Sequence, residues 1–249
     1  MIETEALRKS FGSTLAVSGV NLQVHAGEIF GFLGPNGAGK TTTIKMMAGL
    51  LRPSAGVARI GGHDIQRQPI AAKKLIGYVP DQPLLPEKLS AREFLRFISG
   101  LYQLDRIEAQ RRSEELLRLF GLLERQDELI GGYSHGMRQK TALAGALLHN
   151  PKAFLLDEPT VGLDPRSARL IKDILREVTE RGAAVFMSTH ILEIAERMCD
   201  RVAIINNGVV IATGTLEQLQ SNRAGESLED IFLKLTGGTD AAEIAAALE

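Results

Sequence analysis

Short apolar runs and helical periodicities alternate along this chain, separated by turns rich in glycine. The run at residues 28–33, EIFGFL, predicts a buried strand that continues directly into a glycine loop. Beyond the loop, apolar residues recur from Ile44 to Leu51 at the i, i+3, i+4, i+7 spacing of one helix face, and Pro53 is expected to end this helix. A strand, a loop and a helix therefore follow one another in the first third of the chain.

The middle third of the chain changes to helical periodicity. Ser90 and Glu93 have the spacing of a capping box, which predicts the start of a helix. Apolar residues recur at helical spacing behind this start: Phe94, Phe97, Ile98 and Leu101. Two more helices are predicted at about 113–123 and at 136–149, the second closed by Asn150-Pro151.

An α/β pattern resumes after this helical stretch. Residues 153–156 are apolar and predict a short buried strand, and a helix with apolar positions at 171–178 follows and stops at Gly182. Residues 183–187 predict the next strand. Residues of about 87–149 are therefore expected to form a helical subdomain inserted into an α/β core.

A hairpin signal and a charged tail follow these elements. Asn206-Asn207-Gly208 lies between the apolar runs 202–205 and 209–211, and an Asn-Gly pair in this position is a strong indication of a β-hairpin. The tail beyond Thr215 is expected to carry one further helical stretch.

Composition excludes several classes of function. The 249 residues are 44% hydrophobic and 24% charged, an ordinary globular mixture, and 29 basic residues nearly balance 30 acidic ones. No general positive field attracts nucleic acid, which is not expected as a partner. The single cysteine, Cys199, rules out an internal disulfide and is expected to be a small buried apolar residue.

The start of the chain and its apolar runs bear on its location. The acidic start, Met1–Glu5, lacks the basic and apolar regions of a secretory signal, so the chain is expected to stay inside the cell. The longest apolar runs, such as residues 142–148, fall far short of the about 18 residues that suggest a membrane span. A role at a membrane therefore requires another chain.

The glycine loop matches the phosphate-loop pattern GxxxxGK[ST] in its expected place between a strand and a helix. Its residues are Gly34, Pro35, Asn36, Gly37, Ala38, Gly39, Lys40, Thr41 and Thr42. Glycines allow backbone N–H groups to converge on an anion, and the following helix adds the positive end of its dipole. Lys40 would reach the terminal phosphates of a nucleotide, and the Thr41 hydroxyl would bind Mg²⁺.

Polar residues end two of the predicted strands. In a parallel sheet, Asp157 and Glu158 would lie beside the phosphate loop, where ligands collect. Asp157 is expected to hold Mg²⁺ through water, which leaves Glu158 free as the general base, a role typically worth about 10² to 10⁴ in rate. A solvated strand end or a helix cap is the alternative for this pair. His190, at the end of the other strand, is expected to contact the γ-phosphate.

Together with these elements, residues 133–139, YSHGMRQ, resemble the ATP-binding subunits of ABC transporters. The resemblance covers nearly the whole chain and implies an α/β fold of the P-loop NTPase type, with a RecA-like core, an inserted helical subdomain and an N-terminal β subdomain. Residues 1–220 would form the ABC-type ATPase domain and residues 221–249 a C-terminal helical tail. In that family the signature loop begins a helix that faces ATP held by the opposite subunit, and Ser134 and Gly136 match this loop.

The signature departs from the usual Leu-Ser-Gly-Gly-Gln at Tyr133, His135 and Met137. His135 places a bulky, titratable ring where the family pattern has none, which bears on the affinity and the rate of closure between two subunits. Without the family, Ser134 is simply a helix cap.

The resemblance assigns three more positions. Phe11 matches the aromatic residue that stacks on adenine, with ordinary core packing as the alternative. Asp81 stands where the family has a glutamine that senses Mg²⁺ and links to the transmembrane partner; Gln82 could shift into this role, and a solvated loop carboxylate is the alternative. Asp164 matches a residue of a dimer-contacting loop and is also a candidate N-cap before Pro165.

The function that the resemblance implies is ATP hydrolysis with Mg²⁺ between two subunits that sandwich two ATP molecules. The implied partners are an integral membrane permease and a second ATP-binding subunit, identical or related, at the inner cytoplasmic face of the cell membrane. The signature and residues 227–232, SLEDIF, resemble bacterial export-type subunits. The alternative is a soluble ABC-type ATPase acting on ribosomes or DNA. Such proteins usually have two fused ATPase units or a long coiled-coil insertion, and this sequence has neither.

Overall fold

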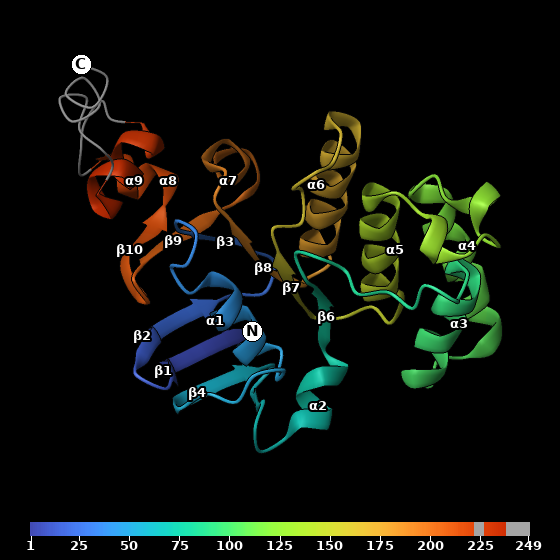
Figure 1. The fold of residues 1–249 in the computed structure, drawn as a ribbon, viewed down its shortest axis with the longest axis horizontal. Helices are drawn as coiled ribbons and strands as arrows, with labels where there is room; N and C mark the ends of the chain where they lie inside the picture. Colours follow the sequence, from blue (N-terminus) through green and yellow to red (C-terminus); the bar gives the residue numbers. More distant parts are fainter. Residues whose placement is uncertain (222–226, 238–249) are drawn as a thin grey trace.

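The computed structural model describes residues 1–221 and 227–237, in which helices flank two β-sheets (Figure 1). The strands are β1 (Ile2–Phe11), β2 (Thr14–Val24), β3 (Ile29–Leu33), β4 (Ala55–Ile60), β5 (His63–Asp64), β6 (Ile76–Val79), β7 (Ala153–Asp157), β8 (Ala184–Thr189), β9 (Arg201–Asn206) and β10 (Val209–Thr215). The α-helices are α1 (Lys40–Met47), α2 (Pro69–Lys74), α3 (Ala91–Leu101), α4 (Arg106–Leu119), α5 (His135–Leu148), α6 (Pro165–Glu180), α7 (Leu192–Met198), α8 (Leu216–Ser221) and α9 (Leu228–Thr236). Two short 3₁₀ helices, Leu123–Arg125 and Ile130–Gly132, precede α5.

The N-terminal sheet has the strand order β2-β1-β4-β5 and is antiparallel throughout. β1 and β2 form a long hairpin in which Ile2 lies opposite Val24 and Phe11 lies opposite Thr14. Buried residues of this sheet, such as Leu7, pack with α1 in one core cluster. The N-terminal sheet therefore supports the helix that follows the phosphate loop (Figure 1).

The larger sheet has the order β10-β9-β3-β8-β7-β6, and its strands from β9 to β6 are parallel. All residues of β3, β7 and β8 are buried, as expected for strands covered on both faces. Because these strands are parallel, their carboxyl ends share one edge, where Asp157 pairs with Ser188 and Leu33 with Thr189. The loop after β3 and the ends of β7 and β8 therefore lie side by side at one edge of the sheet.

The helices α3, α4 and α5 contact one another beside this sheet and fall within the range expected for the helical insertion (Figure 1). The predicted capping box is confirmed, because Ser90 and Glu93 exchange hydrogen bonds at the start of α3. Of the residues that repeat along α3, Phe94 is buried, whereas Phe97 and Leu101 are 58% and 65% exposed.

Several helix boundaries differ from the sequence predictions. α4 begins at Arg106 rather than near 113, because Asp105 caps it by accepting the N–H groups of Ile107 and Glu108. α1 ends at Met47 rather than at Pro53, because Gly49 takes a positive φ of 66° directly after the helix.

The C-terminal region confirms the predicted hairpin and corrects the predicted helix count. Asn207 and Gly208 connect β9 to β10 with positive φ values of 46° and 78°, as a type I′ turn requires. Two helices, α8 and α9, follow Thr215 where one was expected, because Ser227 and Asp230 form a second capping box. The parts of the expected C-terminal tail at 222–226 and 238–249 lie outside the described residues.

The single cysteine is buried and free, as predicted, and burial raises the pKa of Cys199 to about 12. Across residues 1–221 and 227–237, no helix combines the length and hydrophobicity that a membrane crossing needs.

Candidate functional site

The loop after β3 is fixed by close contacts with strand β9 and the β9–β10 turn. A Cβ atom at Gly34 would lie 2.4 Å from the carbonyl oxygen of Ile205, so only glycine allows this approach. Gly39, the N-cap of α1, has a φ of 106°, a conformation that other residues rarely adopt. The Gly208 N–H donates to the Ala38 carbonyl at 3.0 Å. The loop therefore follows one path, with the N-terminus of α1 at its end.

Lys40 is a buried cation within this loop. Its Nζ donates to the carbonyls of Gly34 at 2.7 Å and Pro35 at 3.2 Å, and it lies 3.7 Å from Glu158 Oε1. Burial lowers the pKa of Lys40, and the nearby negative charges of Glu158 and Asp157 partly offset this effect. The geometry places a positive charge where the carboxyl ends of the strands converge.

Asp157 is held by a residue to which the sequence analysis gave no role. The Ser188 hydroxyl donates to Asp157 Oδ1 at 2.5 Å. The other oxygen, Oδ2, is buried and has no hydrogen-bond partner among the described residues. The polar residue Ser188 near the end of an apolar strand was the signal that could have identified this contact. One carboxylate oxygen is thus oriented by the protein, and the other is available to a ligand.

Glu158 lies in an unusual backbone conformation. Its φ is 50°, in the left-handed region, and its N–H donates to the carbonyl and to the hydroxyl of Ser188, each at 3.2 Å. Glu158 Oε1 accepts a hydrogen bond of 2.9 Å from His190 Nδ1, whereas Oε2 is buried and unpaired within the described parts of the chain. The backbone turn after β7 therefore aims this carboxylate at Lys40 and His190.

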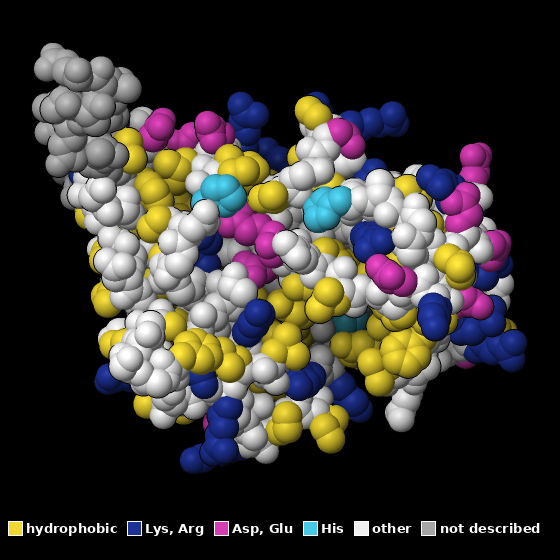
Figure 2. All heavy atoms as spheres, in the orientation of Figure 1, with side chains coloured by type: hydrophobic (Ala, Val, Ile, Leu, Met, Phe, Trp, Pro, Cys, Tyr) yellow, Lys and Arg dark blue, Asp and Glu magenta, His cyan; other side chains and the backbone are white. Residues whose placement is uncertain are grey.

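His190 follows the last residue of β8, and its side chain is 44% exposed. Because Nδ1 bonds to Glu158, only the other ring nitrogen, Nε2, is left for a further partner. Figure 2 shows acidic and histidine side chains gathered at a hollow on this face of the molecule. The structure thus brings together Lys40, Asp157, Glu158 and His190, as the sequence predicts.

The residues proposed to hold Mg²⁺ line one cavity of about 790 Å³: Thr41, Asp81, Gln82 and Asp157. Asp157 Oδ2, buried and unpaired, suits a cation, and Mg²⁺ commonly takes one or two carboxylates and keeps several waters. Within residues 1–221 and 227–237 no group of three or more His, Cys, Asp or Glu side chains is arranged so that it alone could hold a metal ion. The donor set therefore fits Mg²⁺ with water and phosphate oxygens as its other ligands.

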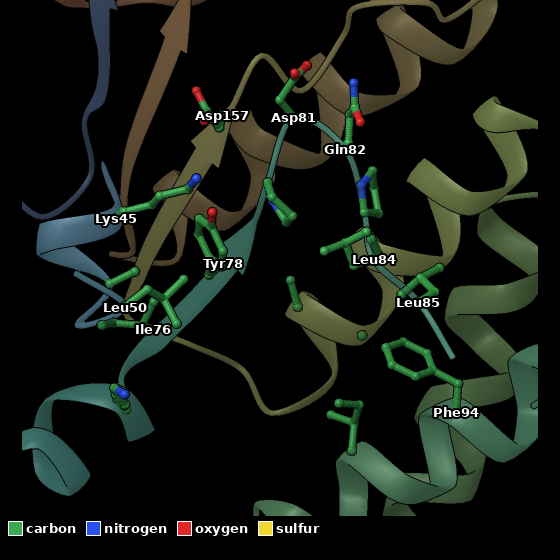
Figure 3. A pocket seen from close by; sticks show the side chains of 18 of the residues that line it. Lys45, Leu50, Ile76, Tyr78, Asp81, Gln82, Leu84, Leu85, Phe94 and Asp157 are labelled. Atoms are coloured by element: carbon green, nitrogen blue, oxygen red, sulfur yellow. The ribbon is translucent and has the colours of Figure 1, made fainter. Parts of the chain in front are cut away.

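Asp81 lies on an exposed loop but close enough to Asp157 and Glu158 for their charges to act on it. Burial, and then the negative charges of Asp157 and Glu158, raise the pKa of Asp81. Figure 3 shows Asp81 between Asp157 and Gln82 at one end of the cavity. Both Asp81 and Gln82 line this cavity. The prediction that one of the two senses Mg²⁺ therefore stays open between them.

The signature segment lies apart from the phosphate loop. Ser134 is exposed and caps α5 by accepting the N–H of Met137 at 3.4 Å. A Cβ atom added at Gly162 would lie 3.1 Å from the His135 ring, and one added at Gly136 would lie 3.5 Å from Leu163. No hydrogen bond or ion pair of the described residues joins Ser134 or Gly136 to residues 34–42. The helix-cap prediction for Ser134 is confirmed.

Two further positions carry side chains at the surface. Phe11 is 50% exposed with Lys9 Nζ 5.1 Å from its ring centroid, so core packing is wrong as an explanation for it. Asp164 caps α6 as predicted by accepting from the N–H and the hydroxyl of Ser167, and these bonds lower the pKa of Asp164. The exposed ring of Phe11 is suited to stacking on a flat ligand.

A parallel sheet whose strand ends carry a phosphate loop, a lysine and two carboxylates defines the P-loop NTPase class of nucleotide hydrolases. The family model described as ABC transporter matches residues 17–161. The chain belongs to the ABC transporter family as an ATP-binding subunit with ATPase activity.

Two relatives and two solved structures illustrate this membership. The chain is 38% identical, over 97% of its length and 77% of the relative, to the linearmycin resistance ATP-binding protein LnrL of Bacillus subtilis (strain 168). It is 41% identical, over 89% of its length and 67% of the relative, to the daunorubicin/doxorubicin resistance ATP-binding protein DrrA of Streptomyces peucetius.

The solved structures agree in fold over most of the chain. An ATP-binding subunit of an ABC transporter superposes with a TM-score of 0.89 at 35% identity, covering 94% of this chain and 99% of that one. A dimeric ATP-binding cassette in a post-hydrolysis state, bound to ADP and Pi, superposes with a TM-score of 0.78 at 27% identity, covering 86% and 98%.

Proposed function

We propose that this chain hydrolyses ATP to drive export through a separate membrane-embedded permease. The observation that carries the hydrolytic part is the position of Glu158, whose Oε1 lies 2.9 Å from His190 Nδ1 and 3.7 Å from Lys40 Nζ. The names of LnrL and DrrA connect those relatives with resistance to linearmycin and to daunorubicin and doxorubicin. Removal of a compound from the cell is one route to resistance, which supports export as the direction of transport.

In this proposal Glu158 accepts the proton of the attacking water. His190, oriented by its bond to Glu158, faces the γ-phosphate, and Lys40 with the backbone N–H groups of residues 36–42 balances the phosphate charge. The exposed ring of Phe11 stacks on the adenine. The enzyme acts mainly by positioning and charge stabilisation, since phosphoryl transfer needs little covalent chemistry from the protein.

The Mg²⁺ part of the proposal rests on the donor set at the edge of the sheet. The Thr41 hydroxyl and Asp157 Oδ2, which has no partner among the described residues, would hold the cation, and Asp81 or Gln82 would sense it from the loop after β6. Bound Mg²⁺ supplies positive charge to the terminal phosphates. Ser188 keeps Asp157 in the orientation that this role needs.

The composite-site part of the proposal concerns Ser134 and Gly136. Both lie at the start of α5, where exposed N–H groups and the helix dipole favour an anion, and neither bonds to residues 34–42 of the same chain. A second subunit, identical or related, supplies these residues to the ATP held here. Loss of the γ-phosphate then removes contacts that favour the closed pair.

The permease part of the proposal uses the apolar side of the same cavity, which Figure 3 shows between α1, β6 and α3. Leu50 and Leu84 at its border are 59% and 96% exposed, unusually high for large apolar side chains. A cytoplasmic segment of the permease with an apolar face fits this surface, and the loop at Asp81 connects it to the nucleotide site. The chain would therefore work at the inner face of the cell membrane.

Replacement Glu158→Gln tests the hydrolytic part directly. The turnover rate should fall about 100-fold or more, because the amide cannot accept the proton, while ATP binding is retained. Glu180→Gln, a change of an exposed glutamate at the end of α6, is the matched control. Steady-state phosphate release measures both variants, and an unchanged rate for Glu158→Gln would show that Glu158 is not the base.

Replacement Leu84→Asp tests the permease part. The chain should be recovered less with membranes of cells that express it, because a charge at this exposed position opposes apolar docking. Ile107→Asp, at an 82% exposed apolar residue on α4 outside this cavity, is the control. Equal recovery of the two variants contradicts docking at Leu84.

A further inference from the structure

A second cavity of about 440 Å³ lies between α4 and α6, away from the nucleotide site. Apolar side chains make much of its wall: Leu116, Leu119, Ile174 and Val178. Leu119 is 48% exposed although it sits beside these apolar neighbours. The volume lies within the range of about 300 to 1,000 Å³ that is common for sites of small organic molecules.

Two guanidinium groups face this cavity from opposite elements. Arg112 on α4 donates through Nη2 to the Leu147 carbonyl at 2.9 Å, and its Nε is buried with no partner among the described residues. Arg181, at the end of α6, is paired with Glu177 but keeps 71% of its side chain exposed. Burial, and then the positive charge of Arg181, lower the pKa of Arg112. Two guanidinium groups of like charge therefore lie close together at this cavity.

The other charges of the cavity limit the ligand to a single negative charge. Lys152 adds a third cation to the lining, while Asp173 and Glu177 add two carboxylates. Glu177 is already paired with Arg181, so one unpaired carboxylate, Asp173, remains in the described lining. A dianion such as phosphate is disfavoured next to Asp173, whereas a monoanionic carboxylate matches the planar fork of an arginine.

We infer that this cavity binds an amphipathic monoanion, an aliphatic carboxylate whose headgroup lies between Arg112 and Arg181 and whose chain covers Leu116, Leu119, Ile174 and Val178. The headgroup places a negative charge between two guanidinium groups whose like charges repel, and the chain removes the apolar wall from water. The bound molecule joins α4 of the helical region to α6, and it stabilises the folded chain by mass action.

Titration of the purified full-length chain with octanoate tests the inference. Saturable heat of binding and a rise in melting temperature are expected for octanoate. Octan-1-ol, which keeps the chain and lacks the charge, and inorganic phosphate, which keeps charge and lacks the chain, should each bind at least about tenfold more weakly.

Variants separate the headgroup contact from general hydrophobic binding. Arg181→Gln removes an exposed side chain and should weaken octanoate binding about tenfold, and Arg112→Gln should do so at least as strongly. Arg118→Gln, on the same helix and exposed outside the cavity lining, should bind octanoate as the unmodified chain does. If Arg112→Gln does not fold, octanoate binding by Arg181→Gln alone tests the headgroup contact.

Three results would overturn the inference. Equal binding of octan-1-ol would indicate an apolar void without a headgroup site, and equal binding of phosphate would indicate a simple anion site. Unchanged octanoate binding by Arg181→Gln would place the carboxylate elsewhere.

Discussion

Ser188 connects the two acidic residues of the site through one hydroxyl group. Its Oγ donates to Asp157 Oδ1 and accepts from the Glu158 N–H, so a single buried side chain orients the residue proposed for Mg²⁺ and the backbone of the proposed base. The short bond to the Asp157 carboxylate, at 2.5 Å, is of the kind that is stronger than a bond between neutral groups. The position of both acidic side chains therefore depends on a fully buried residue.

We expect Ser188→Ala to raise the Mg²⁺ concentration needed for half-maximal ATPase activity about tenfold. The change frees Asp157 Oδ1 and leaves the Glu158 N–H with only its contact to the Ser188 carbonyl, a loss of about 1 to 3 kcal/mol of orienting interaction. Phosphate release at graded Mg²⁺ measures the effect. Thr189→Ala is the control, since its hydroxyl bonds only to the Ile191 N–H in the described structure. A Mg²⁺ dependence equal to that of the unmodified chain contradicts the role of Ser188.

At the scale of elements, α3, α5 and β6 are joined at one aromatic contact. The rings of Tyr102 and His149, which follow α3 and α5, are stacked with centroids 3.7 Å apart and an interplanar angle of 13°. His149 Nε2 donates to the Ile76 carbonyl at 2.9 Å, so Nδ1 is the unprotonated nitrogen of the neutral ring. The contact ties the helical region to the edge of the large sheet.

The free energy of unfolding should depend on pH through this contact. Burial lowers the pKa of His149 from 6.5 to about 4, so between these values the unfolded chain binds a proton that the folded chain does not. The stability is present above about pH 6.5 and is lost as the pH falls toward 4, by about 2 kcal/mol after allowing for the partial exposure of the ring.

Urea unfolding at about pH 7.5 and about pH 5 measures this loss. His149→Gln keeps a donor for the Ile76 carbonyl and removes the titration, so its stability should change less between the two pH values. The same pH dependence in His149→Gln would assign the effect to another group.

The start of α4 gives a second prediction for an element. Asp105→Ala should lower the free energy of unfolding by about 1 kcal/mol, because the N–H groups of Ile107 and Glu108 lose their acceptor. Asp105→Asn keeps a capping oxygen and serves as the control, with an expected loss of only a few tenths of that amount. Equal losses for both variants would show that charge rather than capping is responsible.

At the scale of the whole molecule, the two halves of the proposed ATP site lie on different elements of one chain. Mg-ATP should convert the Glu158→Gln variant to a dimer, because ATP remains bound between two copies. The double variant that also carries Ser134→Arg should stay monomeric with Mg-ATP. Light scattering coupled to sizing measures the mass. Lys140→Arg, a change on the same helix α5 that keeps its charge, is the control. A double variant that still dimerises removes Ser134 from the interface.

The sequence predicts much of this fold because the signals are local. The apolar runs that became β3, β7 and β8, the capping box at Ser90 and the hairpin turn at Asn207 each depend on residues close in the chain. The bond from Ser188 to Asp157 spans 31 positions and arises from the pairing of β8 with β7, so no local pattern reveals it.

The sequence also did not predict the backbone turn at Glu158. Its φ of 50° is of the kind that glycine or asparagine usually indicates, and neither residue stands there. The end of α1 was misplaced because Pro53 is a strong stop signal, whereas Gly49 acts earlier through its own conformation. The sequence places polar residues at strand and helix ends, as it does for Ser134, Asp157 and His190. The distances between them depend on how the strands pair in the sheet.

The turn between β9 and β10 touches the nucleotide loop on one side and the C-terminal helices on the other. Gly208 donates to Ala38, and Asn206 next to it donates to the Thr236 carbonyl of α9 at 3.4 Å. Binding free energies are reciprocal, so a nucleotide that prefers one position of this turn changes the affinity of the chain for whatever contacts α9, by the same factor in both directions. A molecule bound at α9 would thereby set how tightly ATP is held, without reaching the phosphates.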